Sequence, residues 1–390
     1  MNSRERMLTA IGCGKPDYVP LSFMIFNALR MRSGGWEDFV DRSIELGIDP
    51  VVDLVATVPR GGAEHTDCPG TPVHFAGDVT TREWRERPAG SRYAILHKEY
   101  QTPAGTLAVS VNQTDDWPYG DHVPFLNDYL EPRCIRRLVS SPDDLPALKH
   151  LLAEPTAEDL REYREAWGQA KAFARERGLL LTAGWGVGGD ALAWLCGLTN
   201  AVMMAVDRPE FLDAVLDVIS AWNRRRMEII LETGVDLFIR RGWYEGTSFW
   251  SPGLYHRFLL PRLKAEAKLA HDAGAKFGYI MTVGSNQFTD LLLESGADVI
   301  LGVEDMQDHG MDLQRLKAKT RGKVALWGGV NGFLTIEEGK EEDIRKATAA
   351  AMETLGPDGF VLSPVDNIRD SSEKTWRKVL CFIEEWKRLR

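Results

Sequence analysis

The sequence predicts an α/β fold: a single (β/α)8 TIM barrel over residues 1–390, with a β-hairpin insertion at 59–116 after the second strand. Short apolar runs alternate with amphipathic stretches along most of the chain, which is typical of a parallel sheet built from crossover units. The apolar runs in the segment 234–305 also end in polar side chains. Such residues lie at the carboxyl ends of parallel strands, where α/β enzymes place their chemistry.

The amino-terminal part of the chain supplies the first two predicted strands. A short helix beginning at Ser3 stops at the glycines near position 12, and Val19–Met24 is predicted to be a buried strand. Trp36–Leu46 has the apolar spacing of a helix and ends at a glycine. Val51–Ala56 is the second predicted strand.

Residues 59–116 differ from the rest in composition and pattern. They are rich in Gly, Thr and Pro, and their alternating stretches predict β-hairpins. The segment is too short to bury a substantial core by itself. We therefore interpret it as an insertion in the barrel and not as a separate domain.

The rest of the chain continues the strand and helix alternation. Ser251 and Pro252 are suited to begin a helix, Pro261 should kink it, and Gly274 should end it. The remaining strands are predicted at Leu179–Ala183, Val235–Ile239, Lys276–Met281, Asp298–Gly302, Val324–Trp327 and Phe360–Ser363. Further helices are predicted at 143–152, 156–177, 191–197, 209–233, 312–319, 341–355 and 373–389.

Composition excludes several classes of protein. The net charge of −10 argues against a general nucleic-acid or anionic-membrane surface. The five cysteines are far apart and form no CxxC pair, which suits a reducing compartment and indicates no cysteine-ligated metal. The chain begins without the apolar segment of a signal peptide, and no apolar run approaches the roughly 20 residues of a membrane span. We expect a cytoplasmic protein without membrane association.

Two adjacent arginines follow a buried strand. Arg240 and Arg241 come directly after Val235–Ile239, and neighbouring residues of a strand point in opposite directions, so one guanidinium should face the barrel mouth. A guanidinium fork suits a substrate carboxylate or phosphate. It equally suits an ion pair within the mouth. The sequence leaves both interpretations open. For an ion pair, the candidate partners are Glu245, Glu304 and Asp305.

Aromatic and small polar side chains gather at other predicted strand ends. Several aromatic residues could together hold a planar ligand, although packing beneath loops explains any single one equally well. The polar candidates follow strands seven and eight, where they could bind substrate or form turns. The expected substrate-binding set is Arg240, Arg241, Trp243, Trp185, Tyr279, Met281, Trp327, Asn331, Asp366 and Asn367. The candidate acids are Glu245, Asp305 and Tyr244.

Six segments resemble, in order along the chain, the uroporphyrinogen decarboxylase superfamily. The resemblance implies a (β/α)8 barrel of the cofactorless-decarboxylase type. That class also contains cobamide-dependent methyltransferases, including coenzyme M methylating enzymes and demethylases of methoxylated aromatics. The segments are NSRERMLTAIGCGKPDYVPL, KEYQTPAGTL, SPGLYHRFLLPRLKAEAKLAHDAGAKFGYIM, LLLESGADVILGVEDMQ, ALWGGVNG and FVLSPVDNI.

Departures from the pattern of the superfamily select among its branches. True uroporphyrinogen decarboxylases carry an FMRQAGR-like segment and an FDSWA-like aspartate, where this chain has FMIFNALRMR and FIRRGWYEG. The thiol-methylating branch binds zinc through HxCG and a later cysteine. Here the first motif is replaced by Met281-Thr282-Val283-Gly284 and the second falls in Ser363–Asp366. Met is a poor zinc ligand and Val is none, so zinc is not expected.

The leading hypothesis is an enzyme of the methyltransferase-like branch that demethylates a small methylated molecule such as a methoxylated aromatic. No DxHxxG cobamide-binding segment occurs in the chain, so the corrinoid (cobalamin) acceptor is expected on a separate partner protein, and no cofactor is expected to bind tightly. One alternative is decarboxylation of a porphyrinogen-like or other electron-rich carboxylate. Another is a barrel that binds a tetrapyrrole or corrinoid without catalysis. A homodimer is compatible with the sequence.

Overall fold

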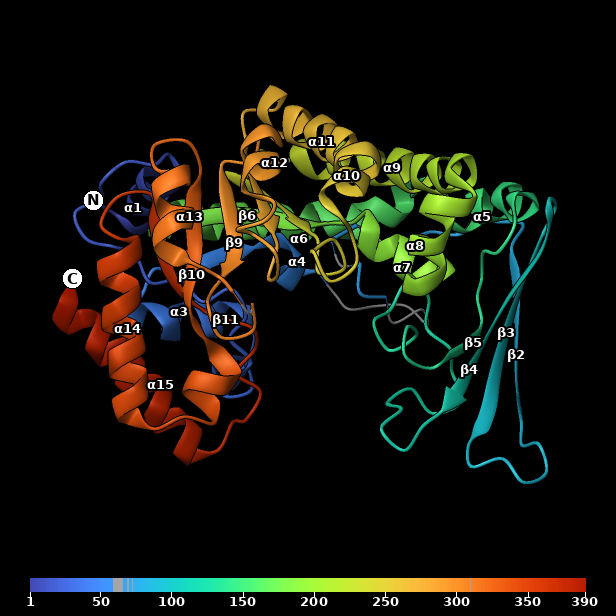
Figure 1. Cartoon of the computed structure of the whole chain (residues 1–390), viewed down its shortest axis with the longest axis horizontal. Coiled ribbons are helices and arrows are strands. Elements are labelled where there is room, and N and C mark those ends of the chain that lie inside the picture. The colour runs from blue at the N-terminus through green and yellow to red at the C-terminus, as the bar shows by residue number, and fades with distance from the viewer. Residues whose placement is uncertain (59–65, 69, 72, 309) are drawn as a thin grey trace.

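The computed structural model describes residues 1–58, 66–68, 70, 71, 73–308 and 310–390, and Figure 1 shows how their helices and strands are arranged. The described strands form a seven-stranded sheet and a four-stranded sheet. Every pairing in the larger sheet is parallel, as the predicted crossover units require. In spatial order its strands are β1 (Val51–Asp53), β6 (Leu180–Gly186), β7 (Leu237–Arg241), β8 (Lys276–Ile280), β9 (Val299–Val303), β10 (Ala325–Asn331) and β11 (Phe360–Val365).

The predicted first strand, Val19–Met24, is wrong as a strand. Only Leu21 forms a bridge, to Leu362 of β11. The Ser22 N–H also donates to the Leu362 carbonyl at 3.0 Å, and the Leu21 carbonyl accepts from the Asp49 N–H at 2.8 Å. Pro20 lacks an N–H and cannot extend a ladder. The two edge strands of the sheet are therefore linked through a short hydrogen-bonded segment.

The second predicted strand is shorter than expected because Asp53, within the predicted range, caps a helix. Strand β1 ends at Asp53, whose carboxylate accepts the Val55 N–H at 3.2 Å. This bond begins α4 (Leu54–Thr57). A carboxylate at this position satisfies a free N–H of the first turn, so the chain leaves the strand three residues before Ala56.

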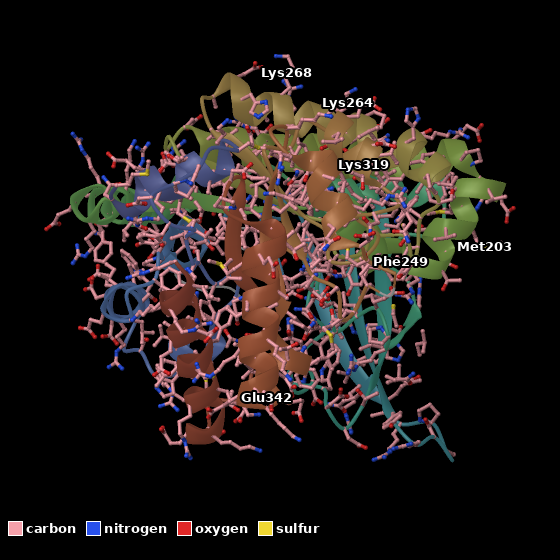
Figure 2. The ribbon with its side chains drawn as sticks, turned by 60° about the vertical axis from the view of Figure 1, so that its left-hand side comes forward. Met203, Phe249, Lys264, Lys268, Lys319 and Glu342 are labelled. Atoms are coloured by element: carbon pink, nitrogen blue, oxygen red, sulfur yellow. The ribbon has the colours of Figure 1, made fainter. Side chains whose placement is uncertain are left out.

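Helices cover the outer face of the parallel sheet (Figure 1). Lys264 and Lys268 of α11 project into solvent, and Lys319 and Glu342 lie on the outer faces of α13 and α14 (Figure 2). The described helices are α1 (Ser3–Ile11), α2 (Asn27–Arg30), α3 (Trp36–Glu45), α4, α5 (Leu145–Leu151), α6 (Ala157–Arg177), α7 (Gly189–Cys196), α8 (Leu198–Asp207), α9 (Pro209–Leu231), α10 (Pro252–Leu254), α11 (Leu260–Asp272), α12 (Thr289–Glu294), α13 (Leu313–Thr320), α14 (Glu341–Leu355) and α15 (Glu373–Leu389).

Three further turns have other helical geometries. Pro142–Asp144 is a 3₁₀ turn, and Gly332–Glu337 and Tyr255–Leu259 are π-helical turns. The last of these directly precedes α11, which has Pro261 in its first turn. Pro cannot donate the backbone bond that an uninterrupted helix would need there. The predicted kink is therefore present as a π-helical turn.

The predicted hairpins form a separate antiparallel sheet at one end of the molecule (Figure 1). Its strands are β2 (Thr80–Glu86), β3 (Ala94–Thr102), β4 (Gly105–Gln113) and β5 (Cys134–Arg136). The first three lie inside the predicted insertion, which confirms the hairpins. Strand β5 extends the sheet beyond residue 116. Residues 59–65, 69 and 72 of the predicted insertion lie outside the described residues.

The parallel sheet separates two apolar cores. Inward-facing side chains of the strands pack with Met7, Ala10 and Ile11 of α1 in the barrel interior. Outward-facing side chains pack with the surrounding helices in a much larger core. Side chains alternate between the faces of a strand, so each strand contributes to both cores. The inward set is Leu180, Leu237, Ile280, Val299, Leu301, Ala325, Trp327 and Val361.

Within the described residues, no single helix has the length and apolarity of a membrane span, and only the bent pair α7 and α8, which meet at 101°, reaches those limits when taken together.

Candidate functional site

The two adjacent arginines of β7 point to opposite faces of the sheet. Arg240 contacts Glu266 of α11, so it lies on the helix side. Arg241 alternates with Leu237 and Ile239 and contacts the ring of Trp243, so it lies on the inner side. This is the arrangement that strand alternation predicts. Arg241 is therefore the arginine of the barrel mouth.

Arg240 is the centre of a buried polar network. Its Nη2 donates to Glu245 Oε1 at 2.7 Å and its Nε donates to Glu266 Oε2 at 2.7 Å. The remaining nitrogen donates to the Arg241 carbonyl. Burial lowers the pKa of Arg240, but the two carboxylates outweigh it and keep the pKa well above its ordinary value. Arg240 is thus a structural cation held between two acids.

Glu245 and Tyr279 belong to this network and not to the mouth, which corrects their predicted placement. Glu245 is fully buried. Its Oε1 also accepts the Gly189 N–H at 2.6 Å, and its Oε2 accepts the Tyr279 hydroxyl at 2.5 Å. A Cβ at Gly189 would lie 2.6 Å from Glu245, so this approach needs glycine. Gly189, the first residue of α7, therefore serves packing.

Arg241 holds two carboxylates that the sequence did not associate with it. Its Nη2 donates to both Asp128 oxygens at 2.7 Å, and its Nε lies 2.7 Å from Asp190 Oδ2. Burial lowers the pKa of Arg241, and Asp190 and Asp128 together raise it above its ordinary value. Asp190 is fully buried, whereas the Asp128 side chain is 30% exposed. Asp128 is the accessible carboxylate of this cluster.

Aromatic rings surround the Arg241 cluster. The guanidinium lies 3.9 Å from the Trp243 ring centre. Trp185 and Trp243 meet edge to face with 6.2 Å between ring centres, and both are half-buried. Trp185 has a φ of 44°, an uncommon conformation for a bulky residue. Such strain is concentrated at functional sites.

Tyr244 connects the aromatic residues with the accessible carboxylate. Its hydroxyl donates to Asp128 Oδ1 at 2.9 Å, the same oxygen that accepts the Trp194 indole N–H at 2.9 Å. Burial and the nearby Asp128 raise the pKa of Tyr244. Tyr244 is therefore a neutral donor at neutral pH, half-buried beside the mouth.

Met281 and Trp327 are both buried. Met281 lies on the helix side of the sheet in the larger core, because it alternates in phase with Tyr279. Trp327 faces inward, but its indole N–H donates to the Ser22 carbonyl at 2.9 Å and its ring fills the barrel interior. The predicted placement of both side chains at a solvent-facing mouth is corrected.

Asp53 is a site residue that the sequence interpretation missed. It follows the inward-facing Val51 by two residues, so it lies on the inner face at the carboxyl end of β1. Burial raises the pKa of Asp53 to about 6. Its partner in β6 is Thr182, whose buried hydroxyl has no hydrogen-bond partner among the described residues. A strand end followed by a carboxylate was the signal available in the sequence.

Glu304 and Asp305 follow β9 but differ in exposure. Glu304 is fully buried and accepts the backbone N–H groups of Met306 and Gln307. Burial raises the pKa of Glu304, and those two N–H groups oppose the shift. Asp305 is exposed and lines a cavity of about 430 Å³ together with Asn331. This cavity extends over α13 and α14.

Asp366 and Asn367 follow β11 as half-buried residues. Asp366 has a φ of 67°, and its carboxylate accepts the Asn367 N–H at 2.7 Å. The Asn367 side-chain oxygen is buried and has no hydrogen-bond partner among the described residues. The pair forms a tight turn with an unsatisfied acceptor. Both the turn and the substrate interpretation of these residues remain compatible with the geometry.

Among the described residues, no group of three or more His, Cys, Asp or Glu side chains could hold a metal ion. All five cysteines are free thiols. Burial raises the pKa of each, most clearly for Cys196, to about 12. The absence of bound zinc stays a prediction.

The family model "Uroporphyrinogen decarboxylase (URO-D)" matches residues 127–369, more than half of the chain. The chain belongs to the uroporphyrinogen decarboxylase family. No curated protein matches the sequence. The matched region contains β6 to β11 and therefore most of the parallel sheet.

Solved structures resemble this family member in fold. A methyltransferase from Methanosarcina mazei is similar over 100% of this chain and 99% of its own, with a TM-score of 0.62 and 15% identity. At that identity the likeness shows the fold. A B12-independent methionine synthase from Shewanella sp. W3-18-1 covers 57% of this chain and 65% of its own at 11% identity, with a TM-score of only 0.40.

Proposed function

We propose that this protein is a methyltransferase that removes the methyl group of a small methylated molecule, such as a methoxylated aromatic. The proposal rests on the family, on the fold shared over its whole length with a methyltransferase, and on one observation within the site. Asp53 lies on the inner face with a pKa of about 6, so about half of it is protonated at pH 6 and about a tenth at pH 7, far more than for a carboxyl with the ordinary pKa. A carboxylic acid of this kind can donate a proton to a leaving oxygen.

The charges of the mouth favour a neutral substrate. Arg241 is held by Asp128 and Asp190, so this cluster carries one positive and two negative groups. A substrate carboxylate would have to displace one of these acids or meet their repulsion. A neutral ether oxygen meets no such charge repulsion. This argues against the alternative that Arg240 or Arg241 grips the acid group of a decarboxylation substrate.

The aromatic residues suit a planar substrate. Trp185 and Trp243 are half-buried and meet edge to face, which leaves part of their indole rings open to a ligand. Asp128 Oδ1 already accepts hydrogen bonds from Arg241, Tyr244 and Trp194, whereas Oδ2 accepts one from Arg241, so Oδ2 is the oxygen that could accept a hydrogen bond from a phenolic hydroxyl of the same ligand. In this arrangement Asp53 takes the place of Glu245, Asp305 and Tyr244 as the proposed acid.

The methyl acceptor in this proposal is a corrinoid carried by a partner protein. When bound, the corrinoid supplies the nucleophile that accepts the methyl group. The mouth fits an acceptor that arrives from outside, because Trp185, Trp243 and Asp128 all retain exposure to solvent. The chain's own residues hold the substrate, exclude water from its methoxy oxygen and protonate the phenolate that leaves.

The test measures methyl transfer from a panel of methoxylated aromatics to reduced cobalamin. The change in cobalamin absorption on methylation reports the transfer. We expect turnover that falls as pH rises through about 6, and a loss of ~10²–10⁴-fold in kcat for Asp53→Asn. Asp305→Asn serves as the control, because Asp305 is exposed over a separate cavity.

Other outcomes would overturn all or part of the proposal. Release of CO2 from carboxylated analogues without methyl transfer would establish decarboxylation instead. Tight binding of a tetrapyrrole or corrinoid with no turnover of any substrate would establish a binding barrel. Full activity of Asp53→Asn would remove Asp53 from the mechanism while leaving the transfer reaction to another acid.

A further inference from the structure

Strand β2 forms an open edge of the antiparallel sheet. The order of that sheet is β2-β3-β4-β5, and β2 runs along the outer side of the molecule, away from the parallel sheet (Figure 1). Every residue of Thr80–Glu86 is exposed, and Trp84 is 37% exposed. An open edge presents unpaired N–H and C=O groups that can pair with another strand.

The edge lacks most of the features that prevent strand pairing. Strand β2 is seven residues long and contains neither Pro nor Gly. Its pairing with β3 runs without a register shift from Thr80 to Glu86, so no bulge turns the edge away. Its only protective feature is charge, and the charges alternate in sign in the order Arg82, Glu83, Arg85, Glu86 around Trp84.

This charge order is complementary to itself in one antiparallel register. If two copies of β2 pair about a two-fold axis at Trp84, Arg82 lies opposite Glu86 of the second copy and Glu83 lies opposite its Arg85. The axis repeats both pairs, so opposite charges meet four times. The two Trp84 side chains then lie opposite each other on the same face.

Shifting the axis by one residue destroys the complementarity. An axis at Glu83 places two carboxylates directly opposite each other, and an axis at Arg85 does the same with two guanidinium groups. Like charges directly opposite on paired strands are destabilising. Register is therefore selected by the charges.

The open face of the hairpin supplies side chains for such a contact. Trp84 stacks on His97, its partner residue in β3, with 4.8 Å between ring centres, which fixes the position of its ring. Arg82 lies 5.3 Å from the Trp84 ring centre and forms no ion pair with any described residue. Glu86 is 3.3 Å from His97 but remains 53% exposed. Arg82 and Glu86 are both available to a second copy.

We propose that a second copy of this chain binds to the β2 edge, joining two antiparallel sheets into one continuous sheet through the two-fold pairing at Trp84. The contact is independent of the proposed catalytic site, because it lies on the other sheet. A seven-residue strand pair is smaller than a standard protein interface. The dimer therefore forms and dissociates with concentration.

Sedimentation velocity of the full chain over a series of concentrations tests the proposal. We expect a concentration-dependent dimer, and an increase of about tenfold or more in its dissociation constant for R82E or E86R, because each variant puts like charges opposite each other twice. The double variant R82E/E86R restores opposite charges and should restore the dimer. R164E, on the exposed face of α6, is the matched control.

The rescue distinguishes this register from other modes of association. A chain that stays monomeric at every concentration overturns the proposal, and so does a dimer that R82E and E86R leave unchanged. Failure of the double variant to recover while both single variants dissociate overturns the pairing at Trp84. Circular dichroism of each variant verifies the fold, which these exposed positions should not disturb.

Discussion

Removing the positive charge of Arg240 should destabilise the protein without a direct effect on catalysis. The change Arg240→Met keeps most of the side-chain volume but leaves Glu245 and Glu266 without their cation. Glu245 is fully buried and Glu266 is 6% exposed. A carboxylate oxygen of each lies 2.7 Å from a guanidinium nitrogen of Arg240, so the substitution removes both ion pairs directly.

The expected magnitude follows from the burial of the pair. Breaking a buried ion pair by removing one partner costs about 3–5 kcal/mol of unfolding free energy. Burial already raises the pKa of Glu266, and Arg240 is the strongest influence that lowers it. In Arg240→Met this carboxyl should bind a proton more readily than in the unfolded chain. The loss of stability should therefore be smaller at pH 5 than at pH 8.

Urea unfolding at both pH values measures this effect. The triple variant Arg240→Met/Glu245→Gln/Glu266→Gln removes the stranded charges and should recover most of the loss. Arg164→Met is the control, because Arg164 forms an exposed ion pair that contributes about 0–1 kcal/mol. A loss below about 1 kcal/mol for Arg240→Met, or no recovery in the triple variant, would refute the reasoning.

Two further predictions concern Asp53 and zinc. The folded-state pKa of Asp53 is about 6 against an ordinary value of 3.8, so the folded protein holds this proton more tightly and its stability should fall as pH rises from about 4 to 6. The Asp53→Asn variant should lack this decline, and at pH 7 its free energy of unfolding, measured with urea, should exceed that of the wild type by about 1–3 kcal/mol. Equal pH profiles of stability for the two proteins would contradict the raised pKa. Protein purified without chelator should contain no tightly bound zinc by atomic emission, and one zinc per chain would contradict this expectation.

Local pattern determined the elements of the parallel sheet. Apolar runs with amphipathic stretches between them indicated β6 to β11 and their helices, because each pattern lies within one continuous stretch of sequence. The same alternation required Arg240 and Arg241 to face opposite sides. The pattern failed at Val19–Met24, where Pro20 limits the ladder, and at Asp53, which caps a helix instead of continuing the strand.

The contents of the candidate site depended on contacts between distant segments. Sequence identified Arg241, Trp185, Trp243 and Tyr244 as residues at strand ends. It did not identify Asp128, which lies 113 residues before Arg241 in the chain and follows the inserted hairpins. The pairing exists because the segment after the insertion returns to the mouth.

The sequence by itself determined the strand and helix pattern, the family resemblance and the polar residues that follow each strand. Only the tertiary structure decided that Glu245 and Tyr279 are buried with Arg240, that Asp128 and Asp190 neutralise Arg241, and that Asp53 has a raised pKa. The physical reason is that burial and charge partners are properties of the packed molecule. Short-range periodicity specifies which face a side chain takes, whereas its neighbours on that face come from segments far away in the chain.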